Sequence, residues 1–219
     1  MKNIIFLFAT MLVSYSCAGQ LTTKNYVLSF PFELKDSVLN SARLIQGKDT
    51  MTRQEALKYV YNNDTSKLTC KGVYYNMETE KVTGKWEELK LPKKCMGIKT
   101  DSFYLVAFTS YECQDPKARQ WNFLNLAIYD RQFNLKDTLI IYKGDEYDDN
   151  INSLINANSC RIFLFKLNEV SKTKDFSILR INPKTLRFET IKIVQVESIN
   201  TDYLLKALVK LGLSDIFYK

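Results

Sequence analysis

Short apolar and aromatic segments separated by polar turns dominate the chain between residues 97 and 194. Four of them have the length of strands and are rich in β-branched and aromatic residues: FYLVAF (103–108), LNLAIY (124–129), TLIIYK (138–143) and IFLFKL (162–167). Their near-continuous apolar character predicts strands that are covered on both faces. LRFETIKIV (186–194) alternates in a mixed register, which leaves its core-facing side ambiguous.

The order strand, polar loop, strand, tight turn, strand occurs twice, over residues 102–143 and 160–194. Asn76, Asp130 and Asn182 each close a strand just before a turn, which hints at a repeat of roughly 53 residues with a degenerate first copy. The fold class predicted is mainly β, a single antiparallel up-and-down meander. A barrel, a two-layer fold and propeller-like repeats remain open as its form.

Two helices and one hairpin accompany the meander. TRQE (52–55) is a capping box, and the apolar spacing after it predicts a helix as far as Tyr61, ended by NND (62–64). TDYLLKALVKLG (201–212) predicts a second helix near the C-terminus that packs on the sheet through Leu204, Leu205, Leu208 and Leu211. Residues 68–76 and 82–91 predict a hairpin, and YVLSFPFEL (26–34) a short strand interrupted at Pro31.

The tripeptide GKW (84–86) resembles the Gly-x-Trp signature of lipocalin-type barrels. An up-and-down meander followed by a C-terminal helix agrees with the general plan of that family, so the resemblance implies a barrel. The motif lies far into the chain rather than near the mature start, and we assign no family from it.

The first residues have the pattern of an export signal. Lys2 precedes ten apolar residues, IIFLFATMLV (4–13), and small residues follow, which is typical of a secretory signal and too short to span a bilayer. Cys17 after Ser16 resembles the lipobox at which bacterial lipoproteins are cut and acylated, whereas an ordinary signal peptidase would cut after Ala18 or Gly19. We therefore expect a signal over residues 1–19 and one mainly-β domain over 20–219. The protein would be periplasmic, or tethered to a membrane of the cell envelope through Cys17.

Four further cysteines follow the signal: Cys70, Cys95, Cys113 and Cys160. In an oxidising compartment an even number suggests disulfides, with three possible connectivities. Loop length slightly favours Cys70–Cys95 and Cys113–Cys160, and buried thiols are the alternative. No CxxC pair is present, which argues against thioredoxin-type redox chemistry.

Composition excludes several function classes. The chain has no histidine, which removes Ser-His-Asp and Cys-His arrangements and every imidazole zinc site. The net charge of +7 comes from scattered lysines without a basic stripe, so nucleic acid is not an expected partner. A chain of 219 residues builds its core without a cofactor, and none is predicted.

Two sets of residues are candidate sites. Asp145, Glu146, Asp148 and Asp149 in GDEYDDN (144–150) offer hard oxygen ligands for Ca²⁺, although the spacing is not that of an EF-hand and a solvated loop is the favoured interpretation. Six aromatic residues would suit a platform for sugars or another apolar ligand, with core packing as the favoured alternative: Tyr74, Tyr75, Trp86, Tyr104, Tyr111 and Trp121.

These observations favour a non-catalytic ligand-binding or interaction module that recognises its partner at a barrel mouth or sheet face. The alternative is a hydrolase that acts on saccharides with paired carboxylates, since such enzymes need only two acids about 5 to 10 Å apart.

Overall fold

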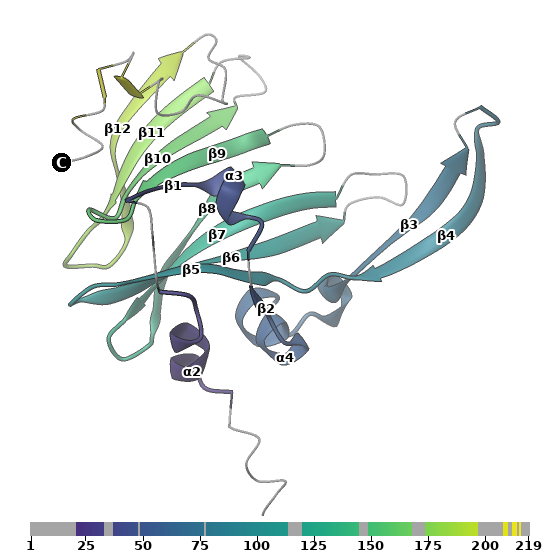
Figure 1. The fold of residues 1–219 in the computed structure, drawn as a ribbon, viewed down its shortest axis with the longest axis horizontal. Helices are drawn as coiled ribbons and strands as arrows, with labels where there is room; N and C mark the ends of the chain where they lie inside the picture. The colour runs from purple at the N-terminus through teal and green to yellow at the C-terminus, as the bar shows by residue number, and fades with distance from the viewer. Residues whose placement is uncertain are drawn as a thin grey trace, which may run out of the picture.

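A computed structural model describes residues 21–32, 37–47, 49–76, 78–113, 120–144, 149–167, 174–196, 208–209, 212–213 and 215. Consecutive antiparallel strands form most of a 10-stranded sheet. They are β5 (Lys93–Lys99), β6 (Phe103–Cys113), β7 (Gln120–Asp130), β8 (Leu135–Gly144), β9 (Asp149–Asn156), β10 (Arg161–Leu167), β11 (Lys174–Ile181) and β12 (Phe188–Val196). This order confirms the predicted mainly-β, up-and-down meander (Figure 1).

A separate hairpin stands apart from this sheet. Among the described strands, β3 (Thr69–Asn76) and β4 (Lys81–Leu89) pair only with each other, and they project away from the body of the molecule (Figure 1). We call this hairpin the arm. It confirms the hairpin predicted from the sequence.

The sheet is not a closed barrel, because the strands at its two ends, β12 and β2 (Asp49–Thr50), are not paired with each other. It also opens partway along β8 and β9. These strands pair only through Lys143–Ile151 and Gly144–Asp149. Further along β9 the short strand β1 (Val38–Asn40) takes the place of β8 as its neighbour. The helix α3 (Ser41–Leu44) follows β1, and the Oγ of its Ser41 donates a 2.7 Å hydrogen bond to Oδ1 of Asn152.

Apolar clusters cover both faces of the sheet. The inner cluster contains residues from strands on both sides of the opening between β8 and β9. Leu105 and Leu126 come from β6 and β7, and Ile155 and Ile162 come from β9 and β10. On the outer face, Tyr26 and Val27 cover β6 and β7, while Leu208 and Leu213 cover β9 to β11. Residues 103–109 of β6 are all buried, which confirms the expectation of strands covered on both faces.

The capping box begins a helix as predicted. The backbone amide of Thr52 donates to the Glu55 carboxylate at 2.8 Å, and the amide of Glu55 donates back to Oγ1 of Thr52. The helix consists of α4 (Arg53–Glu55) and a π-helical turn, η1 (Ala56–Val60). Asn62 and Asn63 end it in the left-handed region, with φ of 49° and 64°. A 3₁₀ turn, η2 (Thr65–Leu68), leads into β3.

The described part of the predicted strand, residues 26–32, does not form a strand. The helix α2 (Thr23–Leu28) extends into it instead, and the side chain of Thr22 caps this helix at the amide of Asn25. Tyr26, Val27 and Phe30 recur at helical spacing and are all buried in the outer cluster. The predicted C-terminal helix lies largely outside the described residues, as do Leu204, Leu205 and Leu211, but Leu208 is buried against the sheet.

A shared turn explains the apparent repeat. The side-chain Oδ1 atoms of Asn76, Asp130, Asn156 and Asn182 each accept two backbone N–H groups from the turn that follows. These residues recur once per hairpin from Asp130 onward, about every 26 residues, so the predicted unit of roughly 53 residues spans two hairpins. From β5 onward the strands belong to one continuous sheet rather than to separate blades.

A bulge accounts for the mixed register of β12. The pairing with β11 shifts at Ile178/Leu179, where Lys192 and Thr190 face consecutive residues. The extra residue, Ile191, moves the following side chains to the other face of the sheet. Phe188 therefore packs against the inner cluster, whereas Val194 packs against an outer one.

Candidate functional site: a polar groove beside the arm

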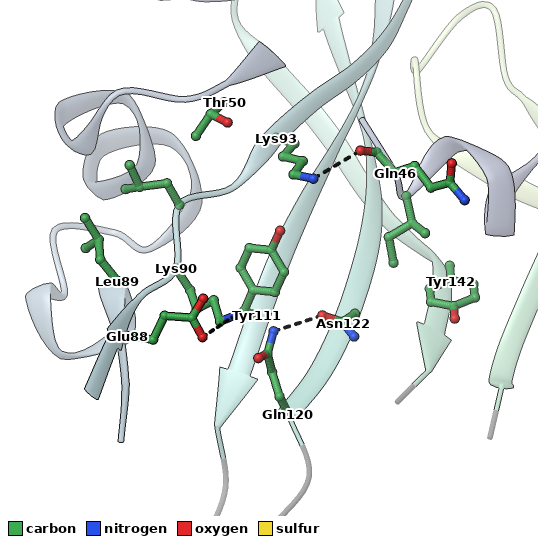
Figure 2. A pocket seen from close by; sticks show the side chains of 12 residues that line it. Gln46, Thr50, Glu88, Leu89, Lys90, Lys93, Tyr111, Gln120, Asn122 and Tyr142 are labelled. Atoms are coloured by element: carbon green, nitrogen blue, oxygen red, sulfur yellow. Dashed lines mark hydrogen bonds and ion pairs between the residues drawn. The ribbon is translucent and has the colours of Figure 1, made fainter. Parts of the chain in front are cut away.

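A groove of about 590 Å³ lies where the arm meets the open end of the sheet. Its wall comes from the residues that follow α3, β2 (Asp49–Thr50), the end of β4 with the residues after it, and β5 to β8 (Figure 2). The lining residues are Ile45, Gln46, Thr50, Glu88, Leu89, Lys90, Leu91, Lys93, Tyr111, Gln120, Asn122 and Tyr142. We call this hollow the groove.

The groove forms because inner-face positions change from apolar to polar toward one end of two paired strands. In β6, Leu105 and Ala107 belong to the inner cluster, and Tyr111 follows at the same period of two. In β7, Leu126 and Leu124 give way to Asn122 in the same manner. The apolar core thus ends in a polar layer open to solvent.

Neutral polar groups in this layer keep unused hydrogen-bonding capacity. Nε2 of Gln120 donates to Oδ1 of Asn122 at 3.0 Å (Figure 2). Oγ1 of Thr109 donates to the Tyr111 hydroxyl at 3.3 Å. Among the described residues, no partner uses the Tyr111 proton, Oε1 of Gln120 or Nδ2 of Asn122. A bound molecule would therefore meet both donors and acceptors here.

The charged groups of the groove are already engaged. Nζ of Lys90 lies 2.6 Å from Oε2 of Glu88, and Nζ of Lys93 donates to the backbone carbonyl of Gln46 at 3.1 Å (Figure 2). Glu88 is the only carboxylate among the groove's twelve described lining residues. The groove therefore presents mainly neutral polar and aromatic surface to a ligand.

A second hollow of about 500 Å³ lies between η2 and β6 to β8. Its walls include Lys67, Glu112, Phe123, Asn125 and Ile140. Nδ2 of Asn125 already donates to Oγ of Ser110 at 2.9 Å and to the carbonyl of Phe108. With its central amide bound in this way, this hollow offers a ligand less than the groove does.

The disulfide at the base of the arm joins Cys70 to Cys113. A disulfide was predicted, but the favoured pairs Cys70–Cys95 and Cys113–Cys160 are wrong. The position of the strands decides the pairing, not the loop length. Cys70 lies near the start of β3, at the base of the arm, and Cys113 is the last residue of β6, which ends beside it. Cys95 and Cys160 are free thiols, and burial raises their pKa values to about 12 and about 11.

Several predicted site residues lie outside the described part of the chain. These are Cys17 and the acidic residues Asp145, Glu146 and Asp148, while Asp149 begins β9 without a described side chain. Within the described residues, no group of three or more acids and cysteines is placed to hold a metal ion. The calcium hypothesis therefore stays a prediction.

The six aromatic residues proposed as a platform do not form one surface. Tyr104 is core, stacked on Phe133 with ring centroids 5.2 Å apart, and Trp121 lies under Nζ of Lys143 at 4.6 Å. Tyr111 lines the groove, whereas Tyr74 and Trp86 lie on the arm. The side chain of Tyr75 is outside the described set.

Sequence reasoning missed Gln120 and Asn122, the two amides of the groove. One signal could have found them. Leu124, Leu126 and Ile128 form a series of every second residue that predicts an inward-facing apolar side chain at position 122. Asn122 is a polar residue at that position.

No protein family model, curated protein or solved structure matches the chain. The GKW tripeptide that resembles the lipocalin signature lies on the arm, where Gly84 and Trp86 belong to β4. Among the described residues, no helix is long and apolar enough to cross a bilayer.

Proposed function

We propose that the protein is an exported, non-catalytic ligand-binding module of the bacterial cell envelope that binds a small, uncharged polar molecule in the groove. The observation that carries the proposal is the set of unused donors and acceptors on Tyr111, Gln120 and Asn122 beside a tyrosine wall. Pockets with a few convergent polar groups and aromatic walls are typical of ligand sites.

Two further features favour a non-catalytic protein over a hydrolase, and an oxidising compartment over the cytoplasm. Hydrolysis by paired carboxylates needs two facing acids, and Glu88 is alone among the groove's described residues and paired with Lys90. The Cys70–Cys113 disulfide suits an oxidising compartment, as the signal-like N-terminus does. The saccharide hydrolase stays an alternative without a specific observation in its favour.

Thermal unfolding of the purified chain tests the proposal. The probes are neutral mono- and disaccharides, capped dipeptides and nucleosides, each added at millimolar concentration. We expect at least one class to raise the midpoint, and Gln120→Ala to remove that shift. Gln132→Ala is the matched control, because this exposed glutamine follows the opposite end of the same strand.

Three outcomes would overturn the proposal. If no probe stabilises the protein, the groove is not a small-ligand site. If Gln120→Ala and Gln132→Ala respond alike, the ligand binds elsewhere. If mass spectrometry finds the bound probe converted to product, the module is an enzyme.

A further inference from the structure

Two aromatic rings lie along one face of the arm, each across a glycine of the opposite strand. Trp86 pairs with Gly72, and Tyr74 pairs with Gly84. A Cβ added to Gly72 would lie 2.4 Å from the Trp86 ring, and one added to Gly84 would lie 3.2 Å from the Tyr74 ring. The absent Cβ atoms therefore let both rings lie close against the backbone.

These rings remain accessible. Tyr74 is 60% exposed, and Trp86 is half-buried on a hairpin that pairs with no other strand of the described residues. An exposed aromatic residue on a projecting hairpin is a feature of binding surfaces, because the ring buries large area at little loss of conformational entropy.

This aromatic face continues from the groove. Glu88 lines the groove, and Trp86 lies two residues before it in β4 with no bulge between them, so the two side chains share a face. Gly84, under Tyr74, is two residues further on. From the body of the molecule outward along the arm, the groove comes first, then Trp86 and then Tyr74. Successive positions on this face are roughly 7 Å apart.

We propose that the groove and this face of the arm form one linear track for an oligosaccharide, a step that rests on the proposed function of the groove. Sugar rings present an apolar face to an aromatic ring and hydroxyl groups at their edge. The amides and tyrosine of the groove match the hydroxyl groups, and Trp86 and Tyr74 match the apolar faces.

Charge separates an oligosaccharide from a nucleic acid as the occupant. On the arm, Lys71 and Lys85 belong to the alternate positions that face the other side, and Lys71 is paired with Glu87 at 3.3 Å. In the groove, Lys90 is paired with Glu88, and Lys93 donates to the backbone carbonyl of Gln46. A phosphate backbone would therefore meet one carboxylate and two engaged lysines on this part of the track, rather than a stripe of available cations.

Fluorescence titration tests the track. The chain has two tryptophans, so Trp121→Phe leaves Trp86 as the sole reporter on the arm. The probes are the disaccharides and hexasaccharides of glucose, N-acetylglucosamine, mannose and xylose. For at least one sugar we expect the hexasaccharide to bind roughly tenfold more tightly than the disaccharide, since each aromatic contact adds a few-fold.

Variants assign that gain to the arm. Tyr74→Ala is expected to reduce hexasaccharide affinity several-fold and leave disaccharide affinity unchanged. Lys85→Ala, on the other face of the same hairpin, is the matched control and should change neither. Trp86→Phe in the wild-type background keeps a ring over Gly72. Measured by calorimetry, this variant should retain most of the affinity that the hexasaccharide gains over the disaccharide.

The outcomes separate the track from the groove. If a disaccharide binds but length adds nothing, or if Tyr74→Ala and Lys85→Ala lose affinity alike, the track is wrong and the groove stands. If no sugar binds while a dipeptide or nucleoside stabilises the protein through Gln120, the oligosaccharide is wrong. If no probe of any class binds, both proposals fail.

Discussion

The ion pair between Lys94 and Glu55 is buried on the outer side of the sheet, beside the capped helix. Nζ of Lys94 lies 2.6 Å from Oε1 of Glu55, and each side chain is only 9% exposed. The other carboxylate oxygen accepts hydrogen bonds from the backbone amide and the hydroxyl of Thr52. One carboxylate therefore caps the helix and fixes it to β5.

Removing one partner of this pair should cost more than removing both. We expect Glu55→Gln to lower the free energy of unfolding by about 3 kcal/mol, because it leaves the Lys94 ammonium buried without a counter-charge. Adding Lys94→Met should recover part of that loss. Urea denaturation at neutral pH measures both, and a loss from the single variant below about 1 kcal/mol would show that the pair is solvated.

Two carboxylates should make the fold sensitive to acid. Burial alone would raise the pKa of Asp130, but hydrogen bonds from Lys136 and Asn134 lower it to about 2. Burial likewise opposes the hydrogen bonds from Lys94 and Thr52, which leave the pKa of Glu55 below its ordinary value. Both groups bind protons more weakly in the folded state, so their contribution is present above their unfolded pKa values and is lost as pH falls through the folded ones.

We therefore expect the free energy of unfolding to decrease from about pH 5 toward pH 2. Asp130→Asn should flatten this dependence, whereas Asp101→Asn, at an exposed turn position, is the matched control. Denaturation midpoints over this range measure the effect. An equally steep dependence in the Asp130→Asn variant would contradict the assignment.

At the scale of elements, the disulfide fixes the position of the arm relative to the sheet. It closes a loop across a sequence separation of 43 residues and joins the start of β3 to the end of β6. Cys70 also pairs across the arm with Glu88, a groove residue. Cross-linking here therefore stabilises the fold and positions one wall of the groove.

Reduction should weaken both properties. We expect the double variant Cys70→Ala/Cys113→Ala to lose about 3 kcal/mol of unfolding free energy. A reducing agent should destabilise the wild type by a similar amount and leave the double variant unchanged. If the reductant destabilises both proteins equally, the stabilisation would not come from the Cys70–Cys113 bond, and the prediction would be wrong.

Elements with a strong local pattern were predictable, and those that depend on partners were not. β6 and β7 are apolar throughout, and the Thr52 capping box is a local signal, so both were found. β9 was missed because Asn152 and Ser153 are polar residues at buried positions. Their partner is Ser41, which is 111 residues away in sequence from Asn152, so no local window contains the pair.

At the scale of the molecule, the groove exists because the sheet ends differently on its two sides. One end of the inner layer is tied together where the amide of Phe188 in β12 donates to Oδ2 of Asp137 in β8 at 2.9 Å. At the other end, α3 and the arm flank the sheet and a polar hollow remains. Its walls draw on positions as distant as Gln46, Glu88 and Tyr142. Tyr111 alone among them was singled out from the sequence, as part of the aromatic set.

The proposed export would place the disulfide and the groove in the same oxidising compartment, and the N-terminal peptide provides the test. Expression of the full chain in a bacterium with a cell envelope, followed by mass spectrometry of the N-terminal peptide, should find an acylated Cys17, or else a chain that begins at Gly19 or Gln20. Cys17→Ser should prevent acylation in the first case and leave the mature mass unchanged in the second, because residue 17 is then removed with the signal. Cys95→Ser is the matched control that leaves processing unchanged.

Because the Cys70–Cys113 bond forms only where thiols are oxidised, peptide mapping of the same sample should find it in the processed chain. A cytosolic chain with Met1 intact and all its thiols reduced would contradict export and, with it, the cell-envelope role of the groove.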